Sequence, residues 1–171
     1  MTAFAADHGS RPAAGALLAL WAAGSGVGGL AYGAREHGLA TDARWVRFTV
    51  AFPLCSAPLV LAPSIPVMAA LALIAGLCLA PFMASANQLI GDVAPPGART
   101  EAFAWPITAI ALGAAGGSAT AGVIIEASGW RAAFLAVIAA GLLAATVAVT
   151  RRRTLTGLDT ARSRSATAAV P

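Results

Sequence analysis

The feature that most constrains this sequence is a stretch of 44 residues, Phe48 to Gly91, without a formally charged side chain. Three shorter uncharged stretches run from Pro12 to Ala34, from Ala102 to Ile125 and from Ala132 to Thr150. A helix needs about 20 apolar residues to cross the hydrocarbon core of a bilayer. The long stretch therefore fits two crossings, with a turn at Pro63 to Pro66, and each shorter stretch fits one. We expect five membrane-spanning helices, near residues 13–33, 46–62, 67–90, 102–126 and 130–150.

The composition supports a membrane protein over a soluble one. Hydrophobic residues make up 58% of the chain and charged residues only 11%, against about a quarter in soluble domains. Soluble helices would need charged faces toward water, and none of the uncharged stretches has one. Low polarity excludes a disordered chain, and two cysteines are too few for a disulfide scaffold. The expected fold class is an all-α polytopic membrane bundle of about five helices in contact with the lipid bilayer.

The arginines predict which way the bundle faces. All 11 basic residues are arginines, and with five spans only Arg11 and Arg131 fall on the amino-terminal side. The other nine fall on the opposite side: Arg35, Arg44, Arg47, Arg99, Arg151, Arg152, Arg153, Arg162 and Arg164. The positive-inside rule then predicts a cytoplasmic carboxyl terminus and an external amino terminus, in a bacterial-type plasma membrane. This placement also argues against nucleic acid as a partner.

The chain divides into three parts on this reading. Residues 1–12 are expected to form an outer loop, residues 13–150 the membrane domain, and residues 151–171 a basic, disordered cytoplasmic tail. The cluster Arg151 to Arg153 directly follows the last span, where basic residues fix topology most strongly.

Glycines recur at four-residue spacing in two spans. Small residues at this spacing allow two helix backbones to approach closely in lipid. The predicted packing positions are Gly24, Gly28, Gly29, Gly33, Gly113, Gly117 and Gly122. Residues 24–29 also match the dinucleotide-binding pattern GxGxxG, but that motif must follow a strand and precede an acidic residue by about twenty positions. Neither condition is met, so we expect no cofactor.

Polar side chains inside the spans are the candidates for solute contact. The expected cavity residues are Trp21, Asn87, Gln88 and Thr108. The alternative for the polar ones is a hydrogen bond to another helix or to their own backbone. No charged residue lies deep in a span, so the sequence offers no carboxylate for proton relay.

Motifs for enzyme chemistry are absent from the sequence. It contains no HExxH, P-loop, CxxC or GxSxG pattern. Both histidines fall in expected loops, and Cys55 and Cys78 fall in different spans, where thiols act as small apolar groups. We therefore expect neither an enzyme nor a metal site.

The order of these features resembles the carboxyl-terminal part of a major facilitator superfamily (MFS) transporter. The segment Pro95 to Trp105, the glycine run Gly113 to Gly122 and the segment Gly129 to Phe134 are similar to the loop before helix eleven, helix eleven and the start of helix twelve. Gly24 to Gly33 resembles helix eight, and Ala80-Pro81 resembles the middle of helix ten.

The resemblance implies helices eight to twelve of a twelve-helix carrier for a small solute, with efflux as the expected direction. It implies a first half that this chain lacks, so the chain alone is expected not to transport. It also places Arg35 in the second basic gating loop, and Arg99 and Glu101 in the loop before helix eleven. The alternative is a small polytopic membrane protein that packs against a partner through its glycine-rich helix faces.

Overall fold

The computed structural model describes residues 1–35, 38, 40–95 and 97–168; the side chains of Arg11 and of residues 152–168 lie outside that description. Every element in the described part is helical. In chain order the elements are α1 (Thr2–Asp7), α2 (Arg11–Gly33), α3 (Thr41–Ser56), the 3₁₀ helix η1 (Ala57–Leu61), α4 (Ile65–Gly76), α5 (Leu79–Val93) and α6 (Arg99–Ala168). The all-α membrane bundle predicted from the sequence is confirmed.

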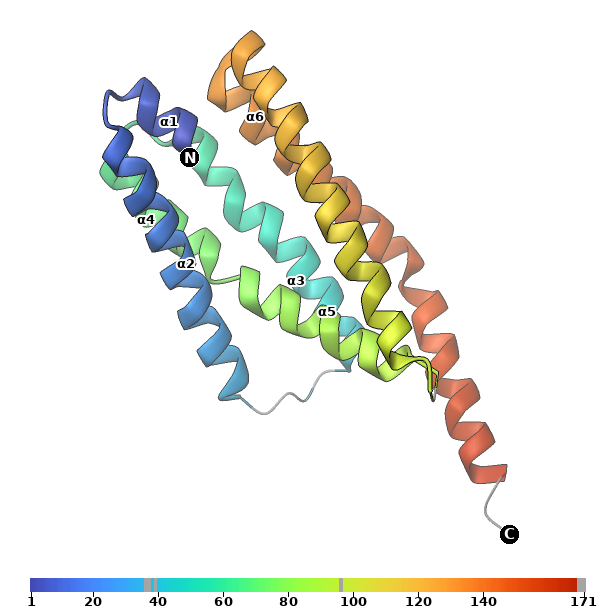
Figure 1. Cartoon of the computed structure of the whole chain (residues 1–171). Helices are drawn as coiled ribbons and strands as arrows, with labels where there is room; N and C mark the ends of the chain where they lie inside the picture. The colour runs from blue at the N-terminus through green and yellow to red at the C-terminus, as the bar shows by residue number, and fades with distance from the viewer. Residues whose placement is uncertain (36–37, 39, 96, 169–171) are drawn as a thin grey trace.

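Helix α6 is two helices joined at Gly129. This glycine has φ 80° and ψ 174°, a conformation that residues with a side chain rarely adopt. The chain reverses there, so that residues 99–128 form a first arm and residues 130–168 a second arm that returns along the bundle (Figure 1). The turn lies where the sequence predicted a loop between the last two spans.

Three stretches of the described residues are long and apolar enough to cross a membrane: Pro12–Gly33, Ile65–Val93 and Arg99–Arg151. The third contains the turn at Gly129 and therefore the whole first arm and the second arm as far as Arg151. The remaining predicted span is α3 with η1; α3 has only 16 residues and carries Asp42, Arg44 and Arg47, so it lies outside the three stretches. Its helix begins at Thr41 rather than at the predicted residue 46.

Different helix ends and turns lie at the two ends of the bundle. Figure 1 places α1, the start of α4 and the turn of α6 at one end, and the end of α2, the start of α3, the end of α5 and both ends of α6 at the other. We call these the α1 end and the Arg44 end.

The α1 end holds the main apolar core. Phe4 and Leu17 pack there with Leu59, Met68 and Trp130. The Trp130 ring meets Phe4 edge to face at 4.9 Å, and its Nε1 donates to Asp7 Oδ2 at 3.2 Å. Residues 1–12 were predicted as an outer loop. They include the short helix α1, which contacts the start of the second arm of α6.

This contact gives a first stability prediction. Trp130→Phe removes the donor to Asp7 and part of the ring, so we expect the free energy of unfolding to fall by about 1–3 kcal/mol. Trp105→Phe is the matched control, because Trp105 is 71% exposed, and it should change this quantity by less than about 0.5 kcal/mol. Denaturation of the purified chain in micelles, followed by circular dichroism, measures both. Equal effects of the two substitutions would contradict the packing of α1 on Trp130.

The predicted span 67–90 is interrupted. α4 ends at Gly76 and α5 begins at Leu79, although the two together form one apolar stretch, Ile65–Val93, that is long enough to cross a membrane. Pro81 explains the position of the break, because it has no amide hydrogen to donate to the carbonyl four residues earlier, that of Leu77. Helix resumes with the amide of Phe82 donating to Cys78 at 3.1 Å.

The tail also differs from expectation. Residues 151–171 were predicted to be disordered, whereas the backbone is helical as far as Ala168. No proline interrupts the sequence between Arg151 and Pro171, and alanine, leucine and arginine all favour helix. The second arm therefore continues past the end of its apolar stretch.

Candidate functional site

A hydrogen-bonded group of side chains joins three helices at the Arg44 end. The Tyr32 hydroxyl, from the end of α2, donates to Gln88 Oε1 on α5 at 3.1 Å. Arg44 on α3 donates from Nη1 to the Tyr32 hydroxyl at 3.2 Å and from Nη2 to Thr41 Oγ1 at 3.2 Å. We call Tyr32, Thr41, Arg44 and Gln88 the Tyr32 cluster. It ties α2, α3 and α5 together.

Aromatic packing surrounds the cluster. Tyr32 is 8% exposed, and Phe48 meets its ring edge to face at 5.6 Å. One turn further along α3, Phe52 stacks on Phe82 of α5 at 6.0 Å. Residues 41, 44, 48 and 52 recur at helical spacing, so one face of α3 presents all of these contacts.

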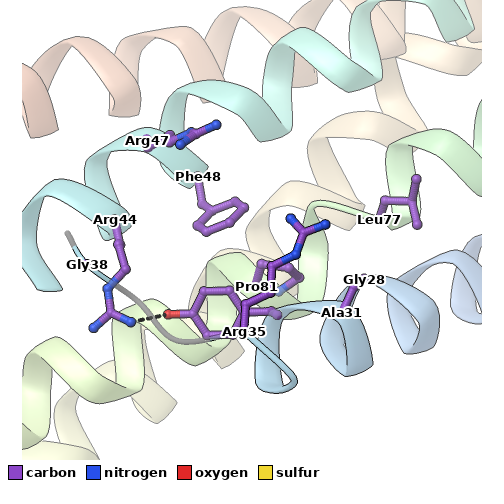
Figure 2. A pocket seen from close by; sticks show the side chains of 10 residues that line it. Gly28, Ala31, Arg35, Gly38, Arg44, Arg47, Phe48, Leu77 and Pro81 are labelled. Atoms are coloured by element: carbon purple, nitrogen blue, oxygen red, sulfur yellow. Dashed lines mark hydrogen bonds between the residues drawn. The ribbon is translucent and has the colours of Figure 1, made fainter.

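A cavity of about 420 Å³ opens beside the cluster. Its walls come from α2, from the start of α3 and from the break between α4 and α5, and its lining residues are Gly28, Ala31, Tyr32, Arg35, Gly38, Arg44, Arg47, Phe48, Leu77 and Pro81. Figure 2 shows the Arg35 guanidinium reaching toward the Phe48 ring, while Arg44 turns aside to its hydrogen bond and Arg47 extends above Phe48. Three of the ten lining residues are arginines and none is a carboxylate.

The four predicted solute residues are dispersed in the structure. Of these four residues, only Gln88 hydrogen-bonds to another helix in the described part of the chain. Trp21 packs against the core at the α1 end, and Thr108 bonds to the Ala104 carbonyl of its own helix at 3.1 Å, the alternative stated for it from sequence. Asn87 is exposed on α5.

The predicted packing glycines fall into two groups. A methyl group at Gly24 or Gly28 would collide with the backbone carbonyl of Leu73 or Leu77, and one at Gly29 would lie 3.0 Å from the Ala80 methyl. The contact between α2 and α4 also uses a glycine of α4, because Gly76 lies against the carbonyl of Trp21 on α2. By contrast, no described residue lies within 4 Å of the Cβ positions at Gly33, Gly113, Gly117 or Gly122.

Four of the six predicted gating and topology residues have described side chains. Arg35 lines the cavity, and Arg99 and Glu101 are exposed in the first turn of α6. Arg151 is exposed on the second arm, and the side chains of Arg152 and Arg153 lie outside the described part of the chain.

Sequence reasoning missed Tyr32, Arg44, Arg47 and Phe48 as site residues. Two signals could have drawn attention to them. Tyr32 is the only tyrosine in the chain and lies at the end of a span, where aromatic rings with a polar tip concentrate. Arg44 and Arg47 are three residues apart, on neighbouring positions of one helix face.

A comparison with known proteins identifies the family of this chain. The sequence model of the Major Facilitator Superfamily matches residues 1–171, which is the whole chain. Searches of curated proteins and of solved structures found no match. The superfamily consists of membrane transporters of small solutes, in agreement with the apolar helices and the resemblance seen in the sequence. The chain belongs to the Major Facilitator Superfamily.

Proposed function

We propose that this chain forms helices eight to twelve of a twelve-helix secondary transporter that exports a small solute. The observation that carries the proposal is the exposed first arm of α6. Every residue from 107 to 120 is exposed, although the segment includes Gly113, Gly116 and Gly117. A face of small residues suits a close helix–helix contact more than contact with lipid chains. A first half of the carrier is the partner that family membership suggests for it.

The order of the elements supports the assignment to helices eight to twelve. α2, α3 with η1, α4 with α5, and the two arms of α6 run alternately between the ends of the bundle (Figure 1). An odd number of crossings puts the termini on opposite sides. Arg35 follows α2, Arg44 and Arg47 lie in the first two turns of α3, and Arg99 begins α6. All four therefore belong to segments at the Arg44 end, which we assign to the cytoplasm by the positive-inside rule.

We further propose that the chain does not transport by itself. Alternating access in this family moves one half of the carrier against the other around a central site. In such a carrier, Trp21, Asn87, Gln88 and Thr108 remain our candidates for solute contact. They need not touch one another, because each would approach the solute from a separate helix.

Three experiments test this function. The DNA upstream of Met1 should contain an open frame for seven further membrane helices; a stop codon or frameshift there would argue against a complete carrier. Cells lacking their own exporters should then accumulate less of a test solute when they express the longer frame, and show no change when they express residues 1–171. Efflux driven by purified residues 1–171 in proteoliposomes would refute the requirement for a first half.

The exposed first arm also supports a second candidate, a small membrane protein that docks on a partner through its glycine face. Gly117→Leu would then abolish a defined complex seen by native electrophoresis of solubilised membranes. Ala115→Leu is the control, because it adds comparable bulk on the same exposed arm, on the helix face opposite Gly113 and Gly117. This reading predicts the complex without any solute flux, which separates it from the carrier.

A further inference from the structure

The cavity beside the Tyr32 cluster has the chemistry of an anion site. Its arginines come from two elements: Arg35 follows α2, while Arg44 and Arg47 lie on α3. Arg35 and Arg47 are exposed, and neither forms an ion pair with a residue in the described part of the chain. Asp42, the carboxylate nearest in sequence to Arg44, is buried in the first turn of α3 and is not among the lining residues. No carboxylate is among the described residues that line the cavity, so its positive charge is not balanced by them.

Arg44 supplies a second, independent observation. Both of its terminal nitrogens are used within the Tyr32 cluster, which fixes the plane of the guanidinium. Its Nε is buried and has no hydrogen-bond acceptor among the described residues. Buried donors without an acceptor are rare in folded proteins, and because Arg44 lines the cavity, a small movement of its side chain would bring Nε to an acceptor from outside the chain.

The shape and walls narrow the class of ligand. Guanidinium groups pair best with oxyanions that can accept from several N–H groups at once, above all phosphate. The rest of the lining is apolar, with Ala31, Phe48, Leu77 and Pro81. The volume of about 420 Å³ lies within the range of small-ligand pockets. A phosphate group attached to an apolar or small neutral body would fit the arginines, the apolar walls and the volume of the cavity.

We propose that this cavity binds a phosphate group, carried either by the headgroup of an anionic phospholipid or by a small soluble phosphate compound. Arg44 orients it through Nε, and Arg35 and Arg47 supply the balancing charge from opposite walls. The site does not depend on whether the chain carries a solute, because it is built entirely from described residues of α2, α3 and the α4–α5 break.

The test uses the full chain purified in neutral detergent. Native mass spectrometry should show retention of phosphatidylglycerol in preference to phosphatidylcholine, and the Arg47→Gln variant should weaken this retention about tenfold, the loss of one charge-assisted hydrogen bond. Arg47 forms no hydrogen bond or ion pair with another residue in the described part of the chain, and circular dichroism verifies that the variant stays helical. Arg99→Gln is the matched control, because Arg99 is exposed at the same end but does not line the cavity.

A competition arm separates the two sources of phosphate. Displacement of the lipid by inorganic phosphate at millimolar concentration would show that the phosphate group itself is recognised, and resistance to it would assign the site to the lipid headgroup. Arg44→Lys keeps the charge but removes Nε, and we expect it to weaken binding as Arg47→Gln does. Equal retention of both lipids together with no binding of inorganic phosphate, or equal losses in Arg99→Gln and Arg47→Gln, would overturn the proposal.

Discussion

Gly28→Ala should lower the free energy of unfolding of this chain by about 1–3 kcal/mol, the usual cost of overpacking a tight contact. The added methyl group would collide with the Leu77 carbonyl oxygen and lie 2.7 Å from the carbonyl carbon, closer than Cβ atoms approach backbone in real proteins. Relief would require α2 and α4 to move apart, which would also loosen the contact of Gly76 with the Trp21 carbonyl. Gly28→Leu should prevent the packing of these helices altogether.

Gly26→Ala provides the matched control for this prediction. Gly26 lies in the same helix two residues away, and no described atom lies within 4 Å of its Cβ position. Alanine is the better helix former, so this variant should be unchanged or up to about 1 kcal/mol more stable. Unfolding in mixed micelles, followed by circular dichroism, gives both values. We expect a lower free energy of unfolding in Gly28→Ala and no decrease in Gly26→Ala. Equal decreases in the two variants would refute the close approach of α2 and α4.

Mild oxidation should join Cys55 to Cys78 in nearly every molecule. The two sulfur atoms are 3.3 Å apart, although Cys55 lies near the end of α3 and Cys78 in the break between α4 and α5. A disulfide needs about 2.05 Å, so a small side-chain adjustment is sufficient. Copper phenanthroline, with oxygen as electron acceptor, would remove two electrons and two protons from the thiol pair. The product closes a chain loop and should raise the free energy of unfolding by about 3 kcal/mol.

Thiol counting and mass measure the outcome. Before oxidation, the denatured chain should react with two equivalents of maleimide, and after it with none, together with a mass loss of about 2 Da for two hydrogens. Cys55→Ser and Cys78→Ser are the controls, each of which should retain one reactive thiol. Two thiols that survive oxidation, or that form dimers between chains, would show that α3 does not lie against this break.

The elements that the sequence predicted well are those set by charge and glycine along the chain. α2 ends at Gly33, as expected, because the uncharged stretch closes at Ala34. The reversal at Gly129 also lies between the two last predicted spans. Both boundaries depend on local properties, namely the cost of placing charge in lipid and the backbone freedom of glycine.

Features that depend on contacts between helices were harder to predict. Pro81 indicated a kink, but the exact break follows from the Leu77 carbonyl, which loses its donor and faces Gly28 on another helix. α3 begins earlier than hydropathy suggests, because Arg44 hydrogen-bonds to Tyr32 and Thr41. Gln88 was singled out from sequence, but its partner Tyr32 lies 56 residues away, and no spacing rule connects the two.

The Gly129 turn has a consequence for how the protein is made. As one continuous helix, the 70 residues of α6 would extend about 105 Å, more than three times the hydrocarbon thickness of a bilayer. With the turn, the apolar parts of both arms can cross the bilayer as one hairpin that leaves the insertion machinery together. A single backbone torsion, available to glycine but strained for other residues, thus decides on which side the newly made carboxyl terminus emerges.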